Sequence, residues 1–217
     1  TYVSYATTYT SPYPQYMESM NKLVELYSKK RDNKSVDSWR EKILSTDKKT
    51  IANYKTDRTN FIAAQAALAL ANAKQAKFAS VQLREPLTQR LREKKQFMQE
   101  AINLYGEASA YRVATITTES AYAIGDIYQH FSKALLTSER PANLSPDELE
   151  QYDILLEDQA FPFEEKAIEF HEINIARSAD GTESKWIKES FTALKTLFPS
   201  RYARAGKADI YREGGVK

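Results

Sequence analysis

Two histidines and no cysteine limit the chemistry that this chain of 217 residues can perform. The residue three positions before each histidine, His130 and His171, is an isoleucine, so the Glu-x-x-His pairs of helical di-metal sites are absent. Asp126 precedes His130 by four residues, and Glu165 precedes Glu169 by four, so each pair can share one helix face. This spacing is common on charged helices, and we expect solvated or capping side chains there and not a metal site.

The motifs of several common enzyme classes are also missing from the sequence. It holds no Gly-rich phosphate loop, no Gly-x-Ser-x-Gly elbow and no His-Glu-x-x-His helix. The net charge of +2 favours neither nucleic acid nor an anionic membrane as a partner. We therefore predict a protein that is not an enzyme, needs no cofactor or metal and binds other proteins. A helical-bundle protein that binds a metal or a small ligand is the alternative.

Apolar residues recur at helical spacing, and alternating strand patterns are nearly absent. In the N-terminal half we expect helices over 15–30 and 36–44, the second capped by Ser35. Because residues 49–83 contain neither Gly nor Pro, we expect one long helix there. No apolar stretch approaches the roughly 20 residues that a membrane-spanning helix needs.

In the C-terminal half, Pro86 is expected to open a helix that ends between 106 and 111, and another follows over 120–136. The strongest helix start has Ser145 as cap, Pro146 at the first position and Glu148 completing a capping box. Pro162 is expected to kink or restart this helix, and Gly181 to end its continuation. A last helix is expected over 184–198.

One helical phrase occurs twice, as Phe97-Met-Gln-Glu-Ala101-Ile102 and as Phe163-Glu-Glu-Lys-Ala167-Ile168. The copies lie about 66 residues apart, close to two lengths of a helix-turn-helix repeat of about 34 residues. The residues that resemble tetratricopeptide repeats are Ala101, Tyr105 and Ala108, as in a second helix, and Ile124, Gly125 and Tyr128, as in the next first helix. The resemblance predicts an all-α fold of antiparallel helix pairs stacked as an irregular tetratricopeptide-like α-α superhelix. A closed helical bundle is the competing all-α fold.

A second resemblance covers about residues 112–204 and is more specific. It is carried by Arg140-Pro141, Leu149-Glu-Gln-Tyr152, Gln159-Ala-Phe161-Pro162-Phe163-Glu-Glu165, His171-Glu172, Trp186 and Pro199-x-Arg201-Tyr202. This part resembles the C-terminal region of long tetratricopeptide proteins of Gram-negative bacteria. Those proteins are exported and are associated with Ton/Exb- or Tol-type energy-transducing systems or with gliding motility.

The resemblance implies a periplasmic or outer-membrane-associated scaffold, partners among those envelope components, no catalytic residue and an export signal upstream of this chain. A substrate-binding envelope lipoprotein built on helical repeats remains a further alternative. We expect three parts: a Tyr-rich segment over 1–13, one helical-repeat domain over 14–204, best matched at 97–204, and a polar tail over 205–217. Nothing in the sequence specifies an oligomeric state.

A partner-binding face can be placed on the helix expected at 120–136. If Ile124 and Phe131 face the core, the opposite side of this helix carries one exposed polar-aromatic stripe, made of Tyr122, Asp126, Gln129 and Lys133. Asn174 and Arg177 would extend it, and our hypothesis is that Tyr122, Asp126, Gln129 and Arg177 contact a partner peptide. The alternatives are a merely solvated face and, for His171, Asn174 and Arg177, hydrogen bonds to a neighbouring helix and turn.

The N-terminus is crowded with tyrosine, at Tyr2, Tyr5, Tyr9, Tyr13 and Tyr16. Tyrosine is a common anchor at protein interfaces. It is also easily buried, and we favour the interpretation that these rings dock the first segment onto the helical array.

Overall fold

The computed structural model describes residues 2–203, and this part of the chain is helical throughout, with no strand. The all-α prediction is therefore confirmed for these residues, while the expected tail over 205–217 lies outside them. The elements are α1 (Tyr2–Thr8), α2 (Tyr13–Lys29), α3 (Asn33–Lys49), the 3₁₀ turn η1 (Ala52–Tyr54), α4 (Asp57–Ser80), α5 (Leu87–Ala110), α6 (Ala114–Leu136), α7 (Pro146–Ala176), the 3₁₀ turn η2 (Arg177–Asp180), α8 (Lys185–Leu197) and α9 (Pro199–Tyr202).

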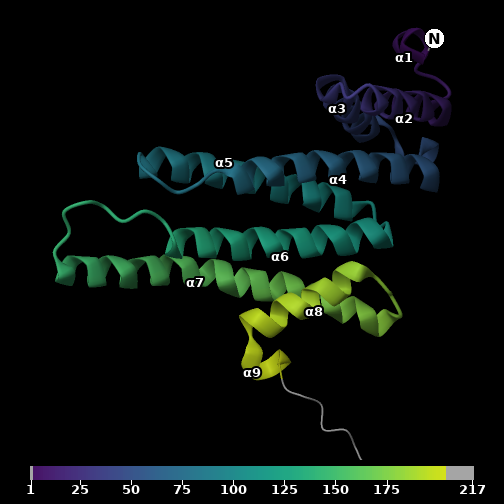
Figure 1. The fold of residues 1–217 in the computed structure, drawn as a ribbon. Coiled ribbons are helices and arrows are strands. Elements are labelled where there is room, and N and C mark those ends of the chain that lie inside the picture. The colour runs from purple at the N-terminus through teal and green to yellow at the C-terminus, as the bar shows by residue number, and fades with distance from the viewer. Residues whose placement is uncertain (1, 204–217) are drawn as a thin grey trace, which may run out of the picture.

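The helices are layered in chain order, each packed mainly against its neighbours in the sequence (Figure 1). The most extensive contacts join α4 to α5 and α6 to α7, which form two long antiparallel hairpins. Contacts also join α2 to α4, α4 to α6 and α6 to α8. These four alternate helices therefore follow one another along one side of the array. No described helix has the length and apolar character needed to cross a membrane.

Short polar signals start several of the helices. The box at the start of α7 is confirmed: Glu148 N donates to Ser145 Oγ over 3.4 Å, and Ser145 N donates to Glu148 Oε2 over 2.8 Å. Gly181 ends η2 at φ 75°, in the left-handed region that glycine adopts without a steric penalty. Ser184 caps α8 by accepting a hydrogen bond from Trp186 N.

The predictions for residues 35–83 were wrong in two respects. Asp32, not Ser35, caps α3 by accepting from Ser35 N over 3.1 Å, so α3 is longer at both ends than expected. The long helix expected over 49–83 is present as α4, but it begins only at Asp57, where Thr56 caps it in a reciprocal pair with Thr59, and it ends at Ser80. A capping threonine can fix a helix start without a nearby Gly or Pro, because it satisfies backbone N–H groups of the first turn.

The expected restart at Pro162 does not occur, since α7 runs unbroken through this residue for 31 residues. Pro162 lies on the exposed side of α7. The carbonyl four residues back, which proline leaves without its helical donor, can bond water on that side.

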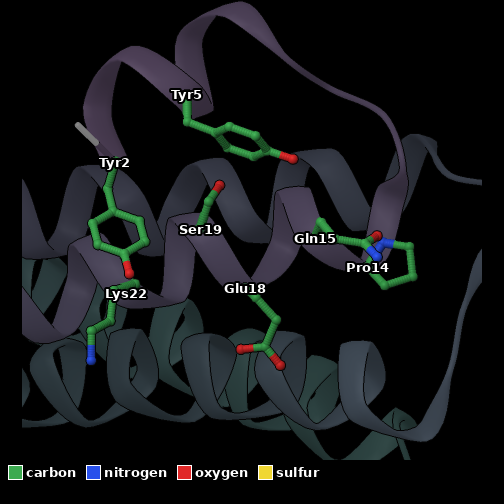
Figure 2. Close-up of a pocket in the computed structure, with 7 residues that line it drawn as sticks. All are labelled: Tyr2, Tyr5, Pro14, Gln15, Glu18, Ser19 and Lys22. Atoms are coloured by element: carbon green, nitrogen blue, oxygen red, sulfur yellow. The ribbon is translucent and has the colours of Figure 1, made fainter.

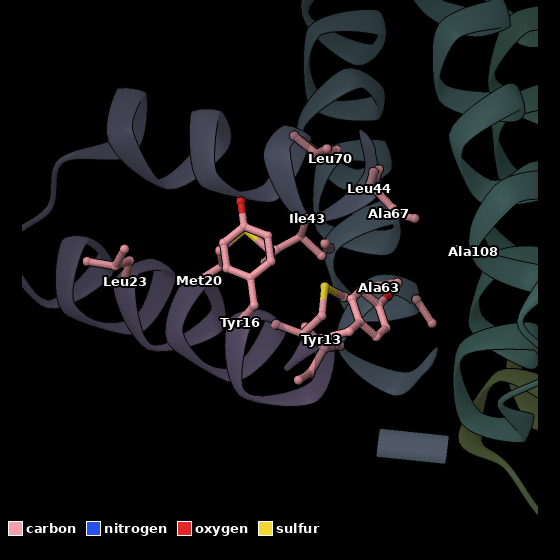
Figure 3. Packing of buried hydrophobic residues seen from close by; sticks show 14 of the residues in the cluster. Tyr13, Tyr16, Met20, Leu23, Ile43, Leu44, Ala63, Ala67, Leu70 and Ala108 are labelled. Atoms are coloured by element: carbon pink, nitrogen blue, oxygen red, sulfur yellow. The ribbon is translucent and has the colours of Figure 1, made fainter. Parts of the chain in front are cut away.

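The core consists of two apolar clusters that share α4. One lies between α2, α3 and α4 (Figure 3), and includes Tyr13, Tyr16, Met20 and Ile43. The other joins α4 to α5, α6 and α7 through members such as Tyr105. Small residues on α4 are buried in both clusters, which lets helices approach it from several sides.

Candidate partner-binding face

The side of the array formed by α2, α4, α6 and α8 carries a groove of about 590 Å³ between α2, α3 and α4. Apolar side chains of Val24, Ile43 and Ile62 line part of it. The amides of Asn21 and Gln65 lie beside them. A peptide laid in this groove would meet apolar surface together with side chains that both donate and accept hydrogen bonds.

A hydrogen-bonded chain continues this face from α4 to α6. The Tyr105 hydroxyl donates to Asn72 Oδ1 over 2.6 Å and also contacts Gln75 Oε1. Gln75 Nε2 then donates to Asp126 Oδ2 over 2.9 Å. Burial raises the pKa of the Asp126 carboxyl, an effect opposed by the charge of His130 and by the Gln75 amide. Asp126 is therefore held in the contact between α4 and α6, half-buried and not on a freely exposed stripe.

Tyr122 lies one turn before Asp126 and packs towards α7 and α8. Its ring centroid lies 5.1 Å from that of Trp186 and 5.5 Å from that of His171. Trp186 Nε1 donates to Glu119 Oε2 over 3.1 Å, which fixes the indole against α6. Burial raises the pKa of the Tyr122 hydroxyl. The ring predicted as an exposed anchor is thus partly buried between three helices.

The other predicted members of the stripe have different environments. Gln129 is half-buried on α6, and Lys133 is exposed. Arg177 lies in a separate cavity of about 440 Å³ by the turn between α5 and α6, beside Arg112, Thr118 and Asp180. The described part of the chain supplies no hydrogen-bond partner for its buried Nε.

Asn174 does not extend an exposed stripe, because it is fully buried. Its amide donates to Thr118 O and Trp186 O, each over 3.1 Å, and to Ser190 Oγ over 2.9 Å. His171 is also fully buried, with Nδ1 3.2 Å from Ser190 Oγ. For these two residues the structure agrees with the alternative interpretation, in which they bond a neighbouring helix.

Neither histidine belongs to a cluster of metal-binding side chains: within residues 2–203 no three His, Cys, Asp or Glu side chains are grouped for that purpose. The His130 ring stands edge-on to Phe78, with centroids 5.1 Å apart. It borders a cavity of about 700 Å³ together with Lys94 and Lys133. Burial and the nearby charge of Lys94 lower the pKa of His130.

The structure also reveals a buried carboxylate that the sequence did not indicate. Asp47 accepts from the hydroxyl of Tyr13 over 2.6 Å and from that of Tyr111 over 2.7 Å, and Lys55 Nζ lies 2.7 Å away. The two tyrosines lie 34 and 64 residues from Asp47 in the chain, so no local pattern could have joined them. Asp47 of α3 therefore holds together α2, through Tyr13, and the C-terminal end of α5, through Tyr111, and its role is structural.

The N-terminal tyrosines fall into two groups. Tyr13 and Tyr16 are buried in the core, whereas Tyr2 and Tyr9 are exposed. Figure 2 shows Tyr2 and Tyr5 of α1 above the residues of α2 with which they border an open cavity of about 920 Å³. Packing of α1 on α2 agrees with docking of the first segment onto the array. Comparisons of the chain with protein-family models, curated proteins and solved structures found no match.

Proposed function

We propose that this chain is a non-enzymatic protein–protein interaction scaffold, built as an irregular tetratricopeptide-like superhelix. Its inner face is the row of α2, α4, α6 and α8, and it receives a peptide segment of a partner protein. The sequential contacts between these alternate helices support this arrangement, because stacked helix pairs bring first helices side by side.

The groove between α2 and α4 carries the proposal. It combines an apolar floor with the side-chain amides of Asn21 and Gln65, and inside residues 2–203 neither amide has a hydrogen-bond partner. Free amides beside apolar surface suit an extended peptide backbone, which needs donors and acceptors together. Tyr122, Asp126, Gln129 and Arg177 are the proposed contacts further along the array.

The resemblance of residues 112–204 to envelope tetratricopeptide proteins supports the location and the kind of partner. We propose a periplasmic or outer-membrane-associated scaffold for energy-transducing or motility components.

Site-specific photo-crosslinking in envelope extracts tests the scaffold. A crosslinking residue at Gln65 or Gln129 should capture the same partner, identified by mass spectrometry. The control is Gln99, exposed on α5, where capture should fail. Tyr122→Ala and Arg177→Glu, checked for folding by circular dichroism, should weaken capture. Equal capture from position 99 would contradict the inner face as the binding site. Capture that neither Tyr122→Ala nor Arg177→Glu weakens would contradict it as well.

Metal analysis and thermal shift with divalent ions address the rival class. Stoichiometric Fe, Mn or Zn, lost on replacing His130 or His171, would overturn the scaffold proposal in favour of a metalloprotein.

A further inference from the structure

The N-terminal half of α7 projects beyond the helix that packs on its C-terminal half (Figure 1). α7 has 31 residues and α8 only 13. At a rise of about 1.5 Å per residue, α8 can cover less than half of α7. Its contacts are with the C-terminal part, where Ser190 meets His171 and Asn174. α9 then stays at that end, since the Tyr202 hydroxyl donates to Glu172 over 2.6 Å.

The uncovered part carries four exposed large apolar side chains, Leu149 among them, and the three most exposed form what we call the α7 ridge: Ile154, Leu155 and Phe161. They are 54%, 53% and 58% exposed. Ile154 and Phe161 are seven residues apart and so lie on one line along the helix. Leu156 and Ala160, on the opposite side, are buried. Leu155 lies about 100° around the helix from Ile154, on the flank of this line. The ridge is therefore not needed to attach α7 to the core, and neighbouring exposed apolar side chains mark interaction sites.

Carboxylates surround the ridge. The exposed ones are Glu150, Glu157, Asp158 and Glu165, and none forms an ion pair with another residue of the described part of the chain. Two nearby acids do have partners: Asp153 accepts from Arg140, and Glu164 accepts from Ser132. The outward carboxylates thus leave a negative rim free to meet external cations.

We propose that the α7 ridge docks a basic amphipathic helix of a partner protein. The apolar face of that helix covers Ile154, Leu155 and Phe161, and its Lys or Arg side chains pair with the rim. A helix fits because α8 already packs on the other half of α7. A second copy of the ridge would oppose carboxylate to carboxylate, and an anionic lipid surface would be repelled in the same way. This surface is separate from the inner face, so either proposal can fail alone.

The test uses the full chain and a Leu/Lys amphipathic peptide of about 18 residues, roughly five helical turns. Titration by fluorescence anisotropy should show binding that weakens with added salt. Phe161→Ser should weaken it about tenfold, and Asp158→Lys should weaken it and reduce its salt dependence. The matched control is Ile51→Ser, an exposed apolar residue outside the ridge, which should bind as the wild type does. Phe161 of the ridge and Asp158 of the rim are both exposed, so both variants should fold, and circular dichroism checks this.

Three results would overturn the proposal. The first is equal binding of a Leu/Glu peptide with the same apolar face, or binding unchanged by Phe161→Ser. The second is ridge-dependent binding to phosphatidylglycerol vesicles in place of the peptide. The third is ridge-dependent dimerisation in sedimentation experiments. Crosslinking from Gln65 on the inner face should be unaffected by every ridge variant, which separates failure of this proposal from failure of the scaffold.

Discussion

Gly125 of α6 lies directly against the imidazole of His171 of α7. A Cβ atom at position 125 would lie 2.7 Å from His171 Nε2 and 2.8 Å from Cε1. The missing side chain lets the ring enter the contact between the two helices, where it is fully buried. One of the residues that carry the tetratricopeptide resemblance is thus paired with one particular ring.

Gly125→Ala should destabilise the fold by roughly 1–3 kcal/mol, the usual cost of forcing extra atoms into a packed core. The ring cannot move away freely, because Ser190 and Tyr122 also contact it. Urea denaturation measures the effect. Gly106→Ala is the matched control: position 106 is exposed on α5 with no atom within 4 Å of a new Cβ. It should gain about 0.5–1 kcal/mol from better helix propensity. If the two variants were equally stable, the His171 ring would have moved to make room for the new methyl group, and the prediction would be wrong.

Burial lowers the pKa of His171 to about 4, from an ordinary value of 6.5. Above pH 6.5 the ring is neutral in both folded and unfolded chains. Between pH 6.5 and about 4 the unfolded chain binds the proton more tightly, so stability falls as pH decreases. The loss from this residue should be about 2 kcal/mol between pH 7 and pH 5.

The contribution of His171 is isolated by comparing wild type with His171→Gln at each pH. Their difference in free energy of unfolding should shrink on acidification, because only the wild type has an imidazole at position 171 that takes up a proton when the chain unfolds. Other titrating groups, including His130 and Asp126, are present in both proteins and cancel. A difference that stays constant from pH 7 to pH 5 contradicts the prediction.

Sequence signals were sufficient where the physical cause is local. Ser145, Pro146 and Glu148 lie within four consecutive residues and fix the start of α7 by mutual hydrogen bonds. The start of α4 was missed because Thr56 and Thr59 form a reciprocal cap without the Glu or Gln that usually marks it.

Side-chain environments in the candidate site could be predicted only in part. Helical periodicity placed Tyr122 and Asp126 away from the innermost face of α6. It could not show that Trp186 and Gln75 cover them, since both contacts depend on how distant helices stack. Asp47 shows the same limit more strongly: on a charged helix it looks like a solvated residue, and its partners come from elsewhere in the chain.

Asp47→Ala should destabilise the protein by about 3 kcal/mol, because it leaves two buried hydroxyls and the ammonium of Lys55 without their acceptor. Asp47→Asn should cost less, since the amide oxygen still accepts one hydroxyl. Guanidinium denaturation measures both. Asp37→Ala serves as the control, since Asp37 pairs only with Arg40 near the surface of α3 and should change stability by less than about 1 kcal/mol. A similar small effect at Asp47 would mean that its hydroxyl partners find water instead.

Lys94 of α5 is buried against the C-terminal end of α4, where its Nζ donates to Phe78 O over 2.8 Å and to Val81 O over 2.9 Å. Lys94→Met keeps the length of the side chain but removes the ammonium that donates both hydrogen bonds, so it should lower the free energy of unfolding by about 1–3 kcal/mol. The control is Lys95→Met, at the exposed position one residue later, which should be nearly neutral.

Burial also lowers the pKa of Lys94 to about 8, below its ordinary 10.5. The unfolded chain therefore holds this proton more tightly between those values, and the wild type should gain about 2 kcal/mol of stability from pH 8 to pH 10. Lys94→Met should lack that gain, and equal pH profiles for wild type and variant would show that Lys94 does not titrate in this range.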